Sequence, residues 1–378
     1  MSALFFYGTL CHVPLLEAVL GVVPGGLSAR LTSATLADHQ VSWVKDQPYP
    51  MIEKVAGQVA CGLVLEAVTE DEEDCLRYYE GAFSYHLSEV LIQVLGAAKT
   101  ALCFYPMSHD QARGAKWELE DWVRGWGEMA VGAARDVMAR RARYDAETAA
   151  SLRPFLMARH WARMMARNGA GPTTRRQSAA PGDVTVHERA EGYRGFFELA
   201  EFQFDHLKFD GTRSPRVGRE AFLAFDAALV LPYDPVTDHI LLIEQLRFGP
   251  LWRDDPQPWI FEPIAGLVDA GEDPADTARR EAMEESGLLL GALEPMVRVY
   301  ASPGYSTEFF HCFLGVVDLS DFSASRNGLT SEHEDIRSHV MPYDTAMALV
   351  HSGEINAGPL IMMLYWLGAE RGRLRAPT

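Results

Sequence analysis

The chain has 378 residues, of which 48% are hydrophobic and 23% charged, and its formal net charge is −18. This length exceeds one ordinary hydrophobic core, so we expect a globular protein of two domains. The negative charge argues against nucleic acid as a partner, because nucleic-acid binding depends on lysines and arginines that neutralise phosphates. A small anionic nucleotide is compatible with this charge if a metal ion brings the positive charge to it.

The sequence also argues against a membrane partner. No stretch approaches the roughly 18 uninterrupted apolar residues of a membrane span, and residues 1–10 lack the basic segment and cleavage site of a signal peptide. Five scattered cysteines form no C-x-x-C pair: Cys11, Cys61, Cys75, Cys103 and Cys312. Their odd number and spacing predict reduced thiols in a cytoplasmic protein.

The first part of the chain alternates short apolar segments with helical patterns. We predict a helix over 13–20 and strands over 3–7, 34–44, 55–68, 86–95 and 100–105. The strand-to-helix turn at Gly8 leaves backbone N–H groups that suit an anion. Thr69 and Glu72 have the spacing of a capping box, which predicts a second helix ending at Glu80.

A helical pattern follows over 111–168, with arginines recurring from Arg135 to Arg167. We interpret these arginines as the solvated side of helices packed on the first domain, with a nucleic-acid or membrane face as the alternative. The segment 168–183 is rich in Gly, Pro, Ser and Thr, which predicts a linker. The expected domains are therefore 1–167 and 184–378, both of mixed α/β (α+β) class.

The second part of the chain begins with predicted strands. Aromatic and β-branched residues over 184–209 predict strands, and 221–231 and 239–245 predict a strand pair joined by a turn. Residues 259–264 predict a further strand, which leads directly into the most informative segment of the chain.

That segment, 266–288, reads GLVDAGEDPADTARREAMEESGL and predicts a helix between two loops. Asp273 suits the N-cap, Pro274 suits the first turn, and Asp276 has a spacing like that of a capping box. Gly287 then provides a left-handed end. The segment therefore holds one helix in a fixed place between its loops.

Three carboxylates of this helix occupy one face. Glu281, Glu284 and Glu285 lie three and four positions apart, so they repel one another unless a cation binds them. A solvated acidic helix is the plainer interpretation of such a cluster. Oxygen ligands at this spacing suit Mg²⁺, with Mn²⁺ as the alternative, and either ion would also bind phosphate oxygens.

The order of the flanking residues distinguishes the two interpretations, because it resembles the Nudix box. The matching positions are Gly266, Glu272, Arg280, Glu281, Glu284, Glu285 and Gly287. The resemblance implies an α/β/α sandwich that hydrolyses nucleoside diphosphates linked to another moiety.

Segments around the box resemble the ADP-ribose pyrophosphatase subfamily. They are EQLR at 244–247, EPIAG at 262–266, ASPGYSTE at 301–308 and SEHEDIR at 331–337. The resemblance implies Mg²⁺-dependent hydrolysis of ADP-ribose to AMP and ribose 5-phosphate. A nucleotide sugar or NADH is the alternative substrate, because the box predicts the type of reaction and does not predict which leaving group the substrate carries.

The same resemblance implies roles for individual residues near the metal. The carbonyl of Ala265, with Glu281, Glu285 and Glu334, would bind Mg²⁺. Glu284 would be a further ligand or would hold a metal-bound water. Glu332 would be the general base for the attacking water, although three acidic residues in one loop are also common on surfaces.

Further residues would position the substrate. Arg280 would pair with Glu272 to orient the box. Arg247 and Glu308 would contact the diphosphate and the terminal ribose. Phe209 and Arg219 resemble residues with which a partner subunit clamps the adenine, which implies a domain-swapped homodimer; a core aromatic and a surface arginine are the alternative interpretation.

Three segments of the first domain resemble the γ-glutamylcyclotransferase (AIG2-like) family: FYGTL at 6–10, GQVACGLVL at 57–65 and YYEGAFSY at 78–85. The resemblance implies a mixed β-barrel with helices that releases 5-oxoproline from a γ-glutamyl compound. The substrate carboxylate would bind the loop of Tyr7, Gly8, Thr9 and Leu10, and Glu80 would move the proton.

The chain departs from that family at Leu87, where an arginine usually stands. A catalytically silent sensor or dimerisation module is therefore the alternative role of the first domain. The fused arrangement resembles bacterial proteins named for tellurite resistance, but the sequence offers no tellurium chemistry beyond ordinary thiols.

Overall fold

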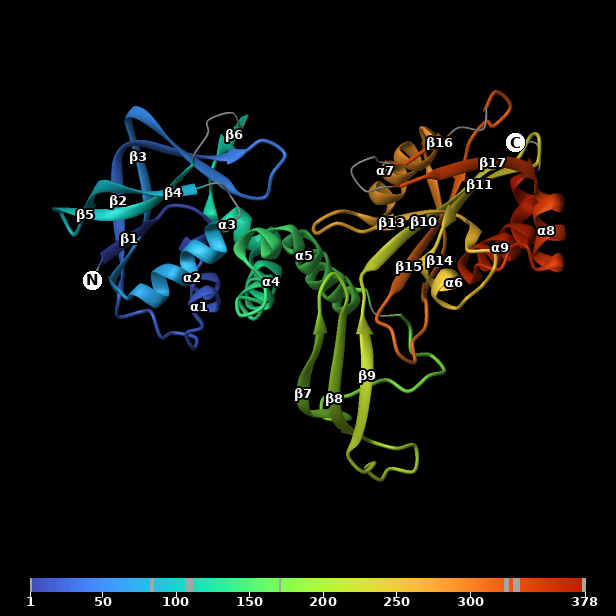
Figure 1. Ribbon diagram of the computed structural model, residues 1–378, viewed down its shortest axis with the longest axis horizontal. Helices are drawn as coiled ribbons and strands as arrows, with labels where there is room; N and C mark the ends of the chain where they lie inside the picture. The colour runs from blue at the N-terminus through green and yellow to red at the C-terminus, as the bar shows by residue number, and fades with distance from the viewer. Residues whose placement is uncertain are drawn as a thin grey trace. The chain divides into compact units, whose positions relative to one another are not determined.

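The computed structural model of the chain describes residues 2–81, 85–106, 112–169, 171–322, 326–328 and 334–375. The chain forms two compact units, Met1–Gly169 and Ala170–Thr378, each built from both helices and strands (Figure 1). The predicted α/β (α+β) class is confirmed. The predicted linker over 168–183 and the domain limits on either side of it stay predictions.

Five strands of the first unit close into a barrel in the order β3-β1-β5-β4-β2, with β2 pairing back onto β3. The strands are β1 (Ser2–Phe6), β2 (Leu31–Val44), β3 (Pro50–Val68), β4 (Tyr85–Val94) and β5 (Ala97–Pro106). Side chains alternate along β1, since Phe5 belongs to one core while Leu4 and Phe6 belong to another. The second core includes helix residues, so it lies between the barrel and the helices that cover it.

The helices of this unit are α1 (Val13–Leu20), α2 (Glu70–Glu80), α3 (Leu119–Trp122), α4 (Glu128–Met138) and α5 (Ala146–Asn168). The predicted capping box forms, because the Thr69 side chain accepts from the Glu72 N–H while the Glu72 side chain accepts from the Thr69 N–H. The helix so fixed ends at Glu80, which is buried.

Two expectations for the region after β5 are wrong. Arg113–Lys116 forms β6, an edge strand that pairs with β2, where the sequence predicts helix. Arg140 and Arg159 are only 1% and 2% exposed, so not all arginines of this region lie on a solvated side. The packing of α4 and α5 covers their long side chains, whose apolar stems suit burial.

The second unit contains an eight-stranded and a three-stranded sheet. The larger follows the order β14-β15-β10-β11-β17-β16, with β12 paired to β11 and β13 paired to β10; the smaller is β7-β8-β9. Their strands are β7 (Val184–Arg194), β8 (Glu198–His206), β9 (Val217–Leu223), β10 (Asp226–Asp234), β11 (His239–Leu246), β12 (Trp259–Glu262), β13 (Ile264–Leu267), β14 (Leu293–Tyr300), β15 (Phe309–Val316), β16 (Arg326–Asn327) and β17 (Ile336–Pro342).

Helices cover both faces of the larger sheet (Figure 1). They are α6 (Phe248–Trp252), α7 (Pro274–Ser286), α8 (Tyr343–Ser352) and α9 (Gly358–Leu374). Alternate residues of β10, such as Leu229 and Leu231, pack against α8 and α9, and α7 lies across β10 and β13. All nine residues of β10 are buried, as expected for the centre of an α/β/α sandwich.

Two predicted strands of this unit are each divided in the structure. The predicted strand 221–231 is interrupted between Leu223 and Asp226. Strand β9 of the small sheet ends at Leu223, and β10 of the large sheet begins at Asp226. The predicted strand 259–264 changes neighbours at Pro263, because β12 pairs with β11 and β13 pairs with β10. Proline lacks the N–H needed to continue a ladder, so the change falls there.

Two expectations from composition can be compared with the structure. All five cysteines are free, in agreement with the predicted thiols. Among the described residues, no helix has the length and apolar character needed to span a membrane.

Candidate active sites

Helix α7 is fixed at both ends. The Asp273 side chain accepts from the Ala275 N–H at 2.8 Å, and Gly287 ends the helix with φ 72°. Asp276 does not act as the expected capping-box partner; its carboxylate accepts from Arg279 at 2.8 Å instead. One face of α7 is thereby held over β13.

Two carboxylates of α7 lie against β13. The Ala265 N–H donates to Glu285 Oε2 at 3.1 Å, and Glu285 is only 2% exposed. A Cβ added at Gly266 would lie 1.8 Å from Oε1 of Glu281, so only glycine leaves room for that carboxylate. Glycine at 266 therefore has a steric reason within this site.

Arg280 connects the predicted box residues. Its Nε and Nη2 each lie 3.2 Å from an oxygen of Glu272, and its Nη1 donates to Glu281 at 2.7 Å and to Glu284 at 3.1 Å. Thr277 Oγ1 also donates to Glu272, at 2.6 Å. The predicted pairing of Arg280 with Glu272 is present, and Glu284 is directed to the same guanidinium.

Burial dominates the electrostatics of the carboxylates. It raises the pKa of Glu281 to about 7, and the nearby charges of Glu284 and Glu334 add to this effect, while Arg280 opposes it. Burial likewise raises the pKa of Glu285 well above its ordinary value, with repulsion from Glu281 and Glu334. Acidic groups crowded into a poorly solvated place favour a bound cation.

Arg247 acts electrostatically on Glu285 of this cluster and on Glu308. Arg247 Nε donates to Glu262 Oε2 at 2.6 Å, and its charge lowers the pKa of Glu285 against the larger effect of burial. Burial raises the pKa of Glu308, and Arg247 again opposes the shift. Sequence reasoning quoted Glu262 within EPIAG without giving it a role; its position beside the box was the available signal.

The donor set suits a hard cation. The predicted ligands Ala265, Glu281, Glu285 and Glu334 would offer only oxygen atoms, which Mg²⁺ prefers to sulfur or nitrogen. In the described ranges of the chain, no three His, Cys, Asp or Glu side chains form a group that could hold a metal ion, so Glu281, Glu285 and Glu334 are not assembled into a closed set of side-chain ligands. An ion bound here would complete its shell with water and phosphate oxygens, as Mg²⁺ commonly does.

Two predicted site residues are not brought to this cluster, and a third, Glu332, lies outside the described residues. Phe209, just after β8, is 96% exposed. Arg219 is exposed on β9, where its guanidinium donates to the Gly218 carbonyl. Arg219 is on strand β9 of the small sheet and Phe209 is in the turn between β8 and β9, whereas α7 lies over the large sheet (Figure 1).

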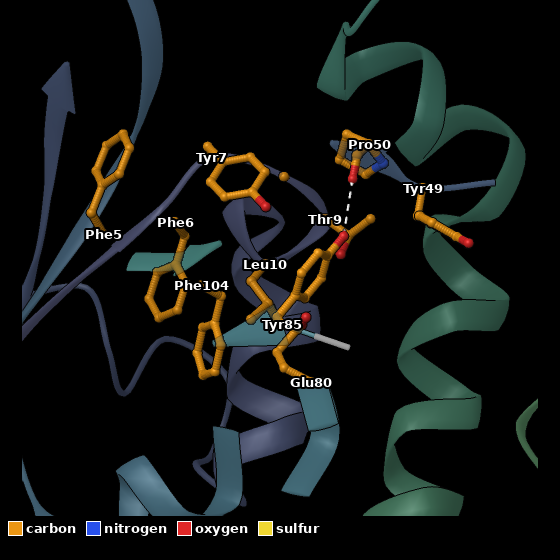
Figure 2. Close-up of a pocket in the computed structure, with 11 residues that line it drawn as sticks. Phe5, Phe6, Tyr7, Thr9, Leu10, Tyr49, Pro50, Glu80, Tyr85 and Phe104 are labelled. Atoms are coloured by element: carbon orange, nitrogen blue, oxygen red, sulfur yellow. Dashed lines mark hydrogen bonds between the residues drawn. The ribbon is translucent and has the colours of Figure 1, made fainter. Parts of the chain in front are cut away.

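The first unit contains a pocket where β1 runs into the turn Thr9–Cys11. Its lining residues are Phe5, Phe6, Tyr7, Gly8, Thr9, Leu10, Tyr49, Pro50, Glu80, Tyr85 and Phe104 (Figure 2). The structure thus brings the predicted loop of Tyr7 to Leu10 together with Glu80. A Cβ added at Gly8 would lie 2.8 Å from the Pro50 side chain, so a larger residue would disturb the lining.

Glu80 is only 7% exposed within this pocket. Burial raises its pKa to about 7, and the positive charge of Arg153 opposes that shift. Tyr85 donates from its hydroxyl to the Pro50 carbonyl at 3.3 Å (Figure 2). Tyr85 and Arg153 were missed by sequence reasoning: Tyr85 was quoted without a role, and Arg153 carries no local motif.

Each of the two units matches one family model. Residues 4–124 match the family model "Gamma-glutamyl cyclotransferase, AIG2-like", and residues 224–362 match the model "NUDIX domain". An ADP-ribose pyrophosphatase of Escherichia coli is 40% identical over 193 residues, which cover 51% of this chain and 91% of that relative. The chain belongs to the Nudix family.

Two further relatives are named for ADP-ribose and for GDP-mannose. An ADP-ribose pyrophosphatase of Haemophilus influenzae is 37% identical over 195 residues, covering 51% of this chain and 89% of the relative. A GDP-mannose pyrophosphatase of Yersinia enterocolitica is 30% identical over 173 residues, covering 46% of this chain and 88% of the relative.

The predicted enzyme class is therefore confirmed. The chain is a Nudix pyrophosphohydrolase that acts on the diphosphate of small-molecule nucleotides. Nudix hydrolases generally use divalent metals such as Mg²⁺. The predicted fusion of an AIG2-like domain with a Nudix domain is also confirmed.

Proposed function

We propose that the Nudix unit hydrolyses ADP-ribose to AMP and ribose 5-phosphate with Mg²⁺. The observation that carries this proposal is a pair of α7 carboxylates against β13, the half-buried Glu281 and the buried Glu285, with Arg247 acting on both Glu285 and Glu308. The 40% and 37% identical relatives bear the name ADP-ribose pyrophosphatase, which supports this substrate over GDP-mannose.

Ala265, Glu281 and Glu285, with Glu334, would hold the Mg²⁺ ion. A bound Mg²⁺ neutralises diphosphate charge and lowers the pKa of a water ligand. Arg280 keeps Glu281 in position through its hydrogen bond and ties it to Glu272. Glu332 would take the proton of the attacking water, and Glu284 would bind metal or orient water.

Substrate contacts follow from charge and burial. Arg247 offers a positive charge to the diphosphate while its bond to Glu262 fixes its direction. The carboxyl of Glu308, partly desolvated, would bind a hydroxyl of the terminal ribose. Phe209 and Arg219 would clamp the adenine of a substrate bound in the partner subunit, so the proposal includes a homodimer. The exposure of Phe209 supports that contact, because the described residues leave 96% of it accessible to a partner subunit.

A nucleotide sugar or NADH is the alternative substrate. The experiment that separates them measures AMP or GMP release from ADP-ribose, NADH, ADP-glucose and GDP-mannose with Mg²⁺. Selective AMP formation from ADP-ribose is the expected result. Faster turnover of another substrate in the panel would keep the Nudix reaction and reject the proposed substrate.

We further propose a γ-glutamylcyclotransferase activity for the first unit. The supporting observation is a buried carboxyl, Glu80, with a pKa of about 7 beside the loop of Tyr7 to Leu10. The loop would bind the substrate carboxylate. Glu80 would take a proton from the glutamyl amine as its nitrogen attacks the side-chain carbonyl, and would pass the proton to the departing amine.

The products would be 5-oxoproline and the free amine, and no further reactant is needed. Loss of 5-oxoproline release in Glu80→Gln is the expected result. No release by the unmodified protein would favour a silent sensor or dimerisation module. A cytoplasmic location and the resemblance to tellurite-resistance fusions stay predictions.

A further inference from the structure

The side chain of Arg153, on helix α5, contacts the end of α2 at which Glu80 lies. Nη2 of Arg153 donates to the Tyr79 carbonyl, and its guanidinium carbon lies 4.1 Å from the centre of the Tyr79 ring. Arg153 therefore contacts Tyr79, the residue next to Glu80, through both a hydrogen bond and a cation–π interaction.

Other side chains of the same region hold α2 as well. Arg141 Nη1 lies 3.0 Å from the Cys75 sulfur and 3.2 Å from Asp71, and the Tyr78 hydroxyl donates to the Tyr144 carbonyl at 3.2 Å. The match to the AIG2-like family ends at residue 124. These contacts to α2 thus come from a helical segment beyond the matched domain.

The position of Arg153 suits its charge. A cation near a helix C-terminus is favourable, since the last carbonyls carry partial negative charge. Glu80 is buried, and the groups that act on it or respond to it are the phenols of Tyr7, Tyr79 and Tyr85 and the guanidinium of Arg153. The phenols are neutral near pH 7, so Arg153 supplies the positive charge in this group.

We propose that Arg153 is a positioning residue of the first unit's pocket, where it fixes the last turn of α2 and provides the counter-charge of the Glu80 carboxylate for a γ-glutamyl substrate. The catalytic consequence rests on the proposed cyclotransferase function; the effect on Glu80 itself does not. The helical segment 125–168 would then be part of this site and more than a spacer.

The direction of the expected effect follows from the sign of the charge. Because Arg153 lowers the pKa of Glu80 against burial, its removal should make Glu80 hold its proton to higher pH. Arg153→Gln removes the charge, and because its amide is two bonds shorter than the Nη2 donor it also gives up the bond to the Tyr79 carbonyl. Arg153→Lys keeps the charge. Arg167→Gln is the control on the same helix, since Arg167 pairs with Glu128 at an exposed position.

The first measurement is the pH profile of 5-oxoproline release from γ-glutamyl-alanine by the full chain. In Arg153→Gln, the midpoint of the acid limb of this pH profile should rise by about one pH unit. The variant should lower kcat by a larger factor than it changes KM. In Arg153→Lys and Arg167→Gln, the midpoint of the acid limb should be the same as in the unmodified protein. An unmoved limb in Arg153→Gln would overturn the role of Arg153.

The second measurement does not need activity. The ¹³C resonance of the Glu80 carboxyl, identified by its loss in Glu80→Gln, is followed with pH in the unmodified protein and in Arg153→Gln. An upward shift of its midpoint supports the inference even if no 5-oxoproline is released, in which case only the cyclotransferase proposal fails. An unchanged midpoint would overturn the inference.

Discussion

The Cα atom of Gly266 lies so close to Glu281 that an added Cβ would be 1.8 Å from Oε1 and 2.0 Å from Cδ of that carboxylate. This glycine is not required by a left-handed backbone, since its φ is not positive. It is required by the approach of α7 to β13, which places a carboxylate over the backbone of the strand.

Gly266→Ala should displace Glu281 and lower kcat/KM for nucleotide hydrolysis by about 100-fold, because misplacement of a reacting group by about 1 Å has that effect. Gly291→Ala is the matched control, as nothing lies within 4 Å of a Cβ there. Steady-state kinetics with ADP-ribose measure the effect. Equal rates for the two variants would show that Glu281 has no positional role.

Metal removal should have a pH-dependent effect on stability. The pKa of Glu281 rises from 4.5 in a reference chain to about 7 in the fold, so its stabilising contribution is fully present below pH 4.5 and lost as the pH rises through 7. In EDTA at pH 8, Glu281→Gln should therefore melt about 2–4 °C above the unmodified protein.

The same comparison at pH 4.5 should show little difference in melting temperature, and added Mg²⁺ at pH 8 should stabilise the unmodified protein more than Glu281→Gln. Thermal unfolding followed by circular dichroism measures both proteins under all three conditions. A melting temperature of the unmodified protein that is unaffected by Mg²⁺ at pH 8 would contradict metal binding at this carboxylate.

Arg280→Lys should lower kcat/KM by about 10-fold, since residues that orient metal ligands commonly contribute 10–100-fold. Lysine keeps the charge but cannot bond Glu272, Glu281 and Glu284 with a planar group. The neighbouring Arg279→Lys is the control, because Arg279 pairs with the exposed Asp276. A kinetic effect in the control as large as that in Arg280→Lys would count against the orienting role.

Phe209→Ser should raise KM for ADP-ribose by about 10-fold through loss of base stacking, without a change in melting temperature. The ring is 96% exposed in the single chain, so the fold does not depend on it. Val236→Ser, at a position 85% exposed, is the control. Light scattering should report a dimer for all three proteins, and an unchanged KM would reject the adenine contact.

Local signals predicted much of the fold. The helix 13–20 and the end of α2 at Glu80 are found as predicted, because capping residues and short-range apolar patterns determine them. The strand Arg113–Lys116 was missed, since it forms by pairing with the distant β2. The strand change at Pro263 also depends on two different neighbours.

The sites divide in the same way. The resemblance to the Nudix box implied that Arg280 pairs with Glu272, and this pair is present, whereas the hydrogen bond of Arg280 to Glu281 was not predicted. Arg153 acts on Glu80 from a helix far along the chain, and no motif surrounds it. Burial of Arg140 and Arg159 likewise depends on the packing of α4 on α5, which composition does not reveal.

The most direct test of the central claim measures AMP release from ADP-ribose with Mg²⁺ by the unmodified protein, by Glu285→Gln and by the control Glu370→Gln, a half-buried residue of α9 that pairs with Arg373. We predict that Glu285→Gln lowers kcat by about 1000-fold, because loss of a metal ligand removes several kcal/mol of transition-state stabilisation, while Glu370→Gln has no effect. Full activity of a folded Glu285→Gln protein would contradict hydrolysis at the α7 carboxylates.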